Sequence, residues 1–200
     1  MTATRPGMRR DAPSTPAATQ ASASAPGRTD GPAPDRRGTR SAAVLVTLLA
    51  IAAAVGGLGG LVSAGAIDGW YAATPKPMFT PPDAVFGPVW TVLYALIAVA
   101  GWLVWRAPDS EARSRALRLY AAQFVLNALW SPVFFGLGEL VGAPGLWAAL
   151  VLIVVLDIVI LATIIRFGDV SRAAAALLMP YWFWSLFATT LNAAITVLAR

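Results

Sequence analysis

The stretch that decides the fold is WYAATPKPMFTPPDAVFGPVWTVLYALIAVAGWLVW, residues 70–105. Its first third carries four prolines: Pro75, Pro77, Pro81 and Pro82. Each fixes its own φ, removes a backbone donor and restricts the residue before it, so we expect a rigid, non-helical loop rich in aromatic side chains. At Pro88, a residue suited to a first helical turn, the stretch becomes a long apolar run. A stiff aromatic loop leading into a membrane-length helix predicts a lid over a flat, apolar site.

The composition is that of a membrane protein. Of the 200 residues 58% are hydrophobic and only 12% are charged, and eight are Trp. Five apolar runs approach the ~20 residues that a helix needs to cross a bilayer, where every backbone group must bond within its own segment. They lie at about 42–66, 85–105, 117–137, 144–165 and 173–198. We therefore expect an all-α membrane protein, a five-transmembrane-helix bundle over residues 41–200.

Three features interrupt these runs. The first run contains a GxxxG motif at 56–60, which favours close helix packing and is equally compatible with a generic small-residue surface. Pro132 and Pro180 lie inside the third and fifth runs, so we expect kinks or unwound turns there.

The first forty residues are rich in Ala, Pro, Thr, Ser and Arg and contain no apolar run, so we expect a disordered tail over 1–40. Seven arginines lie in this tail, and six more flank the loops on the same predicted side, against Lys76 and Arg200 on the other. The positive-inside rule then predicts a cytoplasmic N-terminus and an external C-terminus, in a bacterial inner membrane. Because the basic residues border apolar runs, we expect a lipid bilayer and no nucleic acid as their partner.

The chain has neither Cys nor His, which excludes disulfides, thiolate nucleophiles, imidazole bases and the usual zinc and haem-iron ligands. No nucleophile–base arrangement, phosphate-binding glycine loop or acid pair occurs in the apolar runs. We therefore expect no catalytic residues, no metal site and no resident cofactor.

Helical periodicity gathers aromatic and polar residues into three stripes: at 100° per residue, the members of each stripe fall within about 100° of one another and so share a face. The stripes are Trp90, Tyr94 and Ile97; Asn127, Trp130 and Phe134; and Tyr181, Trp184, Ser185, Ala188 and Asn192. Polar side chains are costly against lipid, so the stripes should face the bundle interior and form a pocket for a planar, apolar ligand. The alternative is ordinary bundle core. For Trp102, Trp105, Trp147 and Trp182 we favour an interfacial belt.

Asp157 is the single acid deep inside an apolar run. A charge there is expensive, so the carboxyl group should be buried and hydrogen-bonded or protonated. One reading is proton or ligand handling; the favoured one is an interhelical hydrogen bond, with Asn127 or Asn192 as the expected partner.

Several separated motifs, in order, resemble the tryptophan-rich sensory protein/translocator protein family (TspO/MBR). They are the WY…KPxFTPP loop, FGPVWTVLY, LNALWSPVFF and MPYWFWSLFATTLN, and the resemblance covers about residues 44–198. It departs from the family loop at Thr74, where Leu is usual, and at Phe79, where Trp is usual. The Tyr followed by Arg or Lys of the animal sterol motif is absent near the end of the fifth run.

The resemblance implies a five-helix protein, often a homodimer, that binds porphyrins such as protoporphyrin IX and other flat lipophilic ligands. Together with the stripes it gives nine expected ligand-binding residues: Trp70, Tyr71, Trp90, Tyr94, Asn127, Trp130, Phe134, Trp184 and Ala188. Three functions follow in order of preference: tetrapyrrole binding and sensing, light-dependent porphyrin degradation, and transport of porphyrins or other lipophiles. Transport is the least favoured because the chain shows no inverted repeat.

Overall fold

A computed structural model describes residues 36–199, with side chains from residue 38. Within this range the regular structure is helical: α1 (Arg36–Asp68), α2 (Trp70–Ala73), α3 (Asp83–Trp105), α4 (Glu111–Ser131), η1 (Pro132–Leu137), α5 (Gly138–Val141), α6 (Ala143–Gly168) and α7 (Arg172–Leu198). Five helical stretches are long and apolar enough to span a membrane, with α4, η1 and α5 forming one of them. The described chain is thus an all-α, multi-pass integral membrane protein, as predicted.

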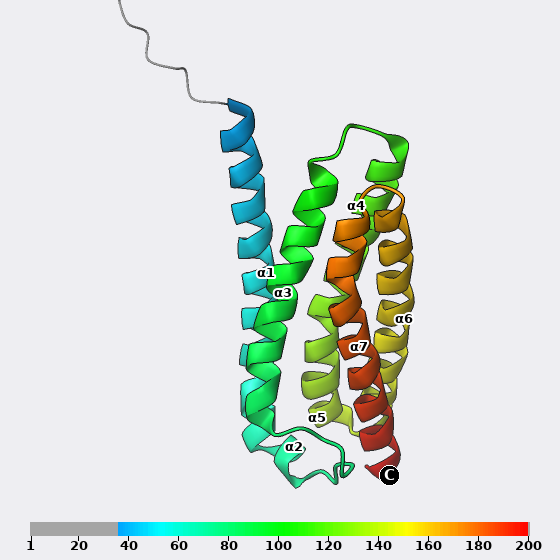
Figure 1. Cartoon of the computed structure of the whole chain (residues 1–200). Coiled ribbons are helices and arrows are strands. Elements are labelled where there is room, and N and C mark those ends of the chain that lie inside the picture. Colours follow the sequence, from blue (N-terminus) through cyan, green and yellow to red (C-terminus); the bar gives the residue numbers. More distant parts are fainter. Residues whose placement is uncertain (1–35, 200) are drawn as a thin grey trace, which may run out of the picture. The chain divides into compact units, whose positions relative to one another are not determined.

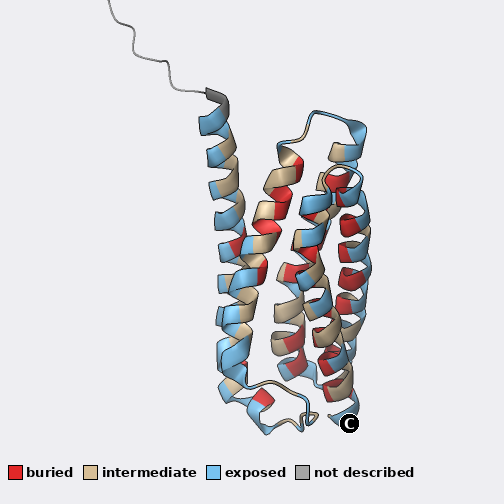
Figure 2. Cartoon of the chain, viewed as in Figure 1, coloured by how far each residue is buried: buried red, intermediate tan, exposed pale blue. Residues whose placement is uncertain are grey.

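Successive spans run antiparallel (Figure 1). The most extensive packing joins α6 to α7, α4 to α6, and α3 to both α1 and α7. Buried residues concentrate on α3, α4, α6 and α7, whereas α1 is mostly exposed (Figure 2). The short helix α2 and the proline-rich segment after it cross one end of the bundle. This arrangement leaves α1 as an outer wall beside the other four spans.

Local chemistry sets several helix boundaries. Ser110 and Ser171 cap α4 and α7, because their hydroxyl groups accept from the backbone N–H three residues on, at 3.1 and 3.3 Å. Between α5 and α6 the chain turns at Gly142, whose φ of 66° is accessible to glycine at little cost. This turn begins the return span α6 directly after α5.

Three expectations about local structure need correction. The loop after α1 is not wholly irregular, because Trp70–Ala73 forms one helical turn before the first proline restricts the backbone. The helix α1 begins at Arg36, so the end of the segment expected as a tail is helical; the rest of that prediction lies outside the described residues. At Pro132 the helix widens into the π-helix η1, whereas α7 continues without an unwound turn through Pro180.

Candidate ligand-binding cavity

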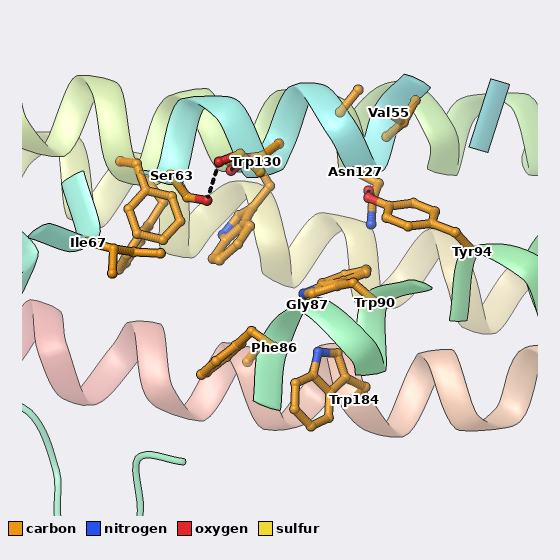
Figure 3. A pocket seen from close by; sticks show the side chains of 18 of the residues that line it. Val55, Ser63, Ile67, Phe86, Gly87, Trp90, Tyr94, Asn127, Trp130 and Trp184 are labelled. Atoms are coloured by element: carbon orange, nitrogen blue, oxygen red, sulfur yellow. Dashed lines mark hydrogen bonds between the residues drawn. The ribbon is translucent and has the colours of Figure 1, made fainter. Parts of the chain in front are cut away.

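A cavity of about 470 Å³ opens between α1, α3, α4–η1 and α7. Its volume falls within the roughly 300–1,000 Å³ typical of small-molecule sites. Figure 3 shows side chains from these helices around one space, with Trp90, Trp130 and Trp184 among them. The cavity therefore has walls from four of the five spans.

The wall from α1 is made largely of backbone. Gly56, Gly57, Gly59, Gly60 and Ser63 all line the cavity. A Cβ atom at Gly56 would lie 2.8 Å from a ring carbon of Tyr94, whereas at Gly57 or Gly60 it would meet nothing within 4 Å. The glycines thus serve close packing against Tyr94 at Gly56, and they leave open space at Gly57 and Gly60.

The opposite walls are aromatic. On α3, the rings of Trp90 and Tyr94 lie 5.3 Å apart at 30°, and Trp90 also meets Tyr181 of α7 at 6.2 Å. Phe86 contacts Trp184 of α7 edge-on at 5.7 Å. Because these rings lock one another in place, they present flat, rigid, apolar surfaces to the cavity.

Polar groups on the wall are joined in a short network. The Tyr94 hydroxyl donates to Asn127 Oδ1 at 2.6 Å, and Asn127 Nδ2 donates to the Tyr181 hydroxyl at 2.9 Å. Trp130 Nε1 donates to Asn192 Oδ1 at 3.3 Å. The buried indole N–H of Trp184 has no protein partner among the described residues. The network holds three helices in register and leaves one indole donor free.

At the α2 end, a second aromatic group closes the cavity. Trp130 stacks on Phe134 with ring centroids 5.2 Å apart, and Tyr71 packs against Phe134 and Phe135. Trp70 Nε1 donates to the Phe135 carbonyl at 3.1 Å, which anchors α2 to η1. The segment containing α2 is therefore tied to the bundle as a lid on this end of the cavity.

The phenol of Tyr71 lies in this lid, outside the membrane-spanning helices. Burial raises its pKa, and the negative charge of Asp83 raises that pKa further. The Lys76 ammonium lies 4.3 Å from the ring centroid of Tyr71. The phenol is consequently neutral at physiological pH and can act as a hydrogen-bond donor at the α2 end of the cavity.

The structure brings eight of the nine expected site residues to the cavity wall. They are Tyr71, Trp90, Tyr94, Asn127, Trp130, Phe134, Trp184 and Ala188. The ninth, Trp70, does not line the cavity; its ring packs on Gly138 and Phe134, and it positions α2 instead. Whether the eight residues bind a ligand stays a prediction.

Sequence reasoning left part of the wall out of the site. The additional lining residues include the α1 glycines, Asp83, Phe86, Ser131, Leu191 and Ile195. Asn192 also lines the cavity; the third stripe placed it there, although it was not among the nine expected binding residues. The GxxxG motif was the available signal for α1, but it does not say which side of the helix meets which neighbour. Ser131 Oγ donates to the Gly59 carbonyl at 3.2 Å, a contact that no periodicity in either helix reveals.

Asp157 does not line the cavity. Its Oδ2 accepts from Thr189 Oγ1 at 2.7 Å, and its backbone carbonyl accepts from Trp182 Nε1 at 3.2 Å. The predicted interhelical hydrogen bond of Asp157 is therefore present, but the predicted partner is wrong: the donor is Thr189, whereas Asn127 and Asn192 bond to other groups. The expectation of an interfacial belt is also wrong for Trp182, because this residue of α7 donates to the carbonyl of Asp157 near the middle of α6.

Among the residues that line the cavity, Asp83 carries the one carboxylate. Within residues 36–199, no group of three His, Cys, Asp or Glu side chains could hold a metal ion. What the arrangement offers is binding chemistry: rigid aromatic surfaces, an indole donor and a phenol at the α2 end.

Comparison with known proteins agrees with this architecture. The TspO/MBR family model matches residues 46–198. The chain is 40% identical over 154 residues to the tryptophan-rich protein TspO of Archaeoglobus fulgidus, covering 77% of this chain and 95% of the relative. It is 35% identical over 150 residues to the tryptophan-rich sensory protein of Cereibacter sphaeroides, covering 75% and 87%.

The similarity extends to animals. The human translocator protein is 39% identical over 125 residues, covering 62% of this chain and 70% of that protein. The family model covers all five spans apart from the first residues of α1. From its helix arrangement and from these matches, the chain belongs to the TspO/MBR family.

Proposed function

We propose that the cavity binds a flat, largely apolar macrocycle of the tetrapyrrole class, and that the chain is a membrane-embedded binding and sensory protein. The observation that carries this proposal is that Trp90, Trp130 and Trp184, from three different helices, line one space of about 470 Å³. Flat indole surfaces bury large areas of a planar ligand, and unpaired N–H donors can select its polar substituents. The sensory part of the proposal rests on the name of the Cereibacter sphaeroides relative.

The proposed contacts are the eight expected residues on the wall, with Trp70 acting through α2. Because the α1 wall has no side chains at Gly57 and Gly60, a ligand can lie directly against its backbone. A larger residue there would occupy the ligand's space without removing any aromatic contact. This makes α1 the cleanest place to test the proposal.

The test compares Gly60→Leu with Gly65→Leu. Both positions are on α1 and have nothing within 4 Å of an added Cβ, but only Gly60 lines the cavity. Purified protein in detergent is titrated with protoporphyrin IX, and binding is followed by quenching of Trp fluorescence. We expect Gly60→Leu to weaken binding by about tenfold or more, and Gly65→Leu to bind like the wild type.

Thermal unfolding of both variants serves as the control for folding. A leucine replacing glycine in a helix does not lower helix propensity, so neither variant should unfold at a lower temperature. Equal affinity of Gly60→Leu and the wild type would reject the cavity as the site. The double variant Trp90→Phe/Trp184→Phe should also bind protoporphyrin IX more weakly. Unchanged affinity in this variant would show that the two indoles do not contribute to binding.

A second function, light-dependent degradation of the bound porphyrin, is favoured by one observation. The ring centroid of Trp90 lies 5.3 Å from that of Tyr94, which also lines the cavity, and 6.2 Å from that of Tyr181, which does not, so Trp90 adjoins two further oxidisable rings. The bound pigment would supply the photochemistry, with molecular oxygen as the oxidant, and the protein would supply orientation. Illumination of the complex should then bleach the porphyrin absorption faster in the wild type than in Trp90→Phe; equal bleaching rates would exclude this role for Trp90.

The homodimer that the resemblance implies and the predicted orientation with the N-terminus in the cytoplasm remain predictions. The described helix with the most exposed surface is α1, where Leu58 and Leu61 are 63% and 76% exposed. In a bilayer, this face meets lipid or a second copy of the chain. Single-cysteine crosslinking along α1 in native membranes would distinguish these two.

A further inference from the structure

The end of the bundle opposite the lid is strongly basic. There α1, α4 and α7 begin and α3 and α6 end (Figure 1). Among the residues whose side chains are described, from residue 38 on, seven arginines and three acids lie at this end: Arg40, Arg106, Arg113, Arg115, Arg118, Arg166 and Arg172, and Asp109, Glu111 and Asp169. An excess of positive charge at the boundary of membrane-spanning helices attracts anionic groups.

The three acids are already paired with three of these arginines. Arg113 pairs with Asp109, Arg115 with Glu111 and Arg166 with Asp169. In the described part of the chain, Arg40 and Arg106 form no ion pair with a carboxylate. Both are exposed, so their guanidinium groups are available to an anion from outside the protein.

Arg40 and Arg106 lie against two tryptophans that are three residues apart on α3. The guanidinium carbon of Arg106 lies 4.5 Å from the ring centroid of Trp102, and that of Arg40 lies 5.8 Å from the ring centroid of Trp105. Cation–π attraction to an indole holds a guanidinium group at a preferred position. Each arginine is therefore ordered before any ligand arrives, which reduces the entropy cost of binding.

A hydrogen bond fixes the two helices relative to each other at this point. Trp102 Nε1 of α3 donates to the backbone carbonyl of Ser41 at 3.0 Å and lies 3.2 Å from the Ser41 hydroxyl oxygen. Ser41 follows Arg40 on α1, and Arg106 follows Trp105 at the end of α3. The bond brings both arginines to the same edge, one from each helix.

From this geometry we infer that the α1–α3 edge formed by Arg40, Ser41, Trp102, Trp105 and Arg106 binds the phosphate group of an anionic phospholipid. Guanidinium groups present paired N–H donors that match phosphate oxygens, and tryptophans favour the headgroup level of a bilayer. The site lies at the opposite end of α1 and α3 from the cavity and does not depend on the proposed function.

A lipid is favoured over a soluble phosphate by what lies next to the arginines along α1. Val44 and Ile51 lie four and eleven residues after Arg40, which places both on the same side of α1 as Arg40. Val44 is half-buried and Ile51 is 46% exposed, so they form an apolar track that leads away from the basic edge. A phosphate bound at Arg40 and Arg106 can thus place its acyl chains on apolar side chains, which a free phosphate cannot do.

The test uses the full chain in detergent and native mass spectrometry with added phosphatidylglycerol or phosphatidylcholine. The test variant is Arg40→Gln/Arg106→Gln. The control is Arg115→Gln/Arg166→Gln, which removes two arginines from the same end that already have acidic partners. We expect the test variant to lose affinity for phosphatidylglycerol by roughly 10- to 30-fold and the control to change it by less than about twofold.

Three results would overturn the inference. The first is unchanged phosphatidylglycerol affinity in the test variant, and the second is an equal loss in the control, which would indicate general attraction to a basic surface. The third is displacement of phosphatidylglycerol by an equal concentration of sn-glycerol 3-phosphate, which has no acyl chains and would indicate a soluble anion site. Weaker binding of phosphatidylcholine than phosphatidylglycerol in the wild type supports the anionic class.

Discussion

Two alanine substitutions, four residues apart on α1, should have very different effects. A Cβ atom at Gly56 would lie 2.8 and 2.9 Å from two ring carbons of Tyr94, closer than van der Waals contact. At Gly60 the same atom would meet nothing within 4 Å. The pair therefore separates the effect of packing from the effect of replacing glycine in a helix.

The Tyr94 ring cannot move away freely. Its hydroxyl donates to Asn127 at 2.6 Å, and its face lies against Trp90 at 5.3 Å. Relieving the overlap costs about 1–3 kcal/mol for overpacking and about 0.5–1.5 kcal/mol for the hydrogen bond. We expect Gly56→Ala to be about 2–4 kcal/mol less stable than Gly60→Ala, which lowers the melting temperature by about 4–16 °C for a chain of this size.

The assay is thermal unfolding in one detergent, followed by intrinsic fluorescence. In a Tyr94→Leu background the ring is absent, so adding Gly56→Ala should cost less than about 0.5 kcal/mol. If Gly56→Ala melts within about 2 °C of Gly60→Ala, the close α1–α3 contact does not restrain Tyr94 and the reasoning fails.

Two further predictions concern buried polar groups. Thr189→Val removes the donor to Asp157 and should lower the free energy of unfolding by about 1–3 kcal/mol. Thr189→Ser keeps a hydroxyl donor and should retain most of the wild-type stability. Equal melting temperatures of the two variants would contradict this prediction. Because burial and the charge of Asp83 raise the pKa of Tyr71 above its ordinary 10.0, the stability associated with the neutral phenol is complete below pH 10.0 and is lost as the pH rises above it. Melting temperatures measured from about pH 8 to 11 should therefore fall less steeply in Tyr71→Phe than in the wild type, and identical slopes would refute the assignment.

Much of the cavity wall could be predicted from periodicity alone. Trp90 and Tyr94 lie four residues apart on one helix, as do Trp130 and Phe134, so each pair shares a face whatever the neighbouring helix is. Polar residues on the same faces, such as Asn127, indicated that these faces turn away from lipid. The structure places all five on the cavity wall.

Pairings across helices could not be predicted in this way. Asp157 was expected to bond to an asparagine, but Thr189 is its partner because α6 and α7 meet at that level. Trp182 likewise was expected at the membrane surface and instead donates to the Asp157 carbonyl. A tryptophan's position along a span says little about its partner, since neighbouring helices determine which face is covered.

The sequence by itself determined the number of spans, the lid segment with its prolines, and the inward faces of three helices. These are local properties: a helix in lipid must satisfy its own backbone, and its faces follow from a repeat of 3.6 residues. Only the tertiary structure decided that α1 contributes a wall of bare backbone, that Trp70 anchors α2 rather than lining the cavity, and that Arg40 and Arg106 meet at one edge. Those facts depend on the rotation and depth of each helix against its neighbours, which the packing of all five spans sets together.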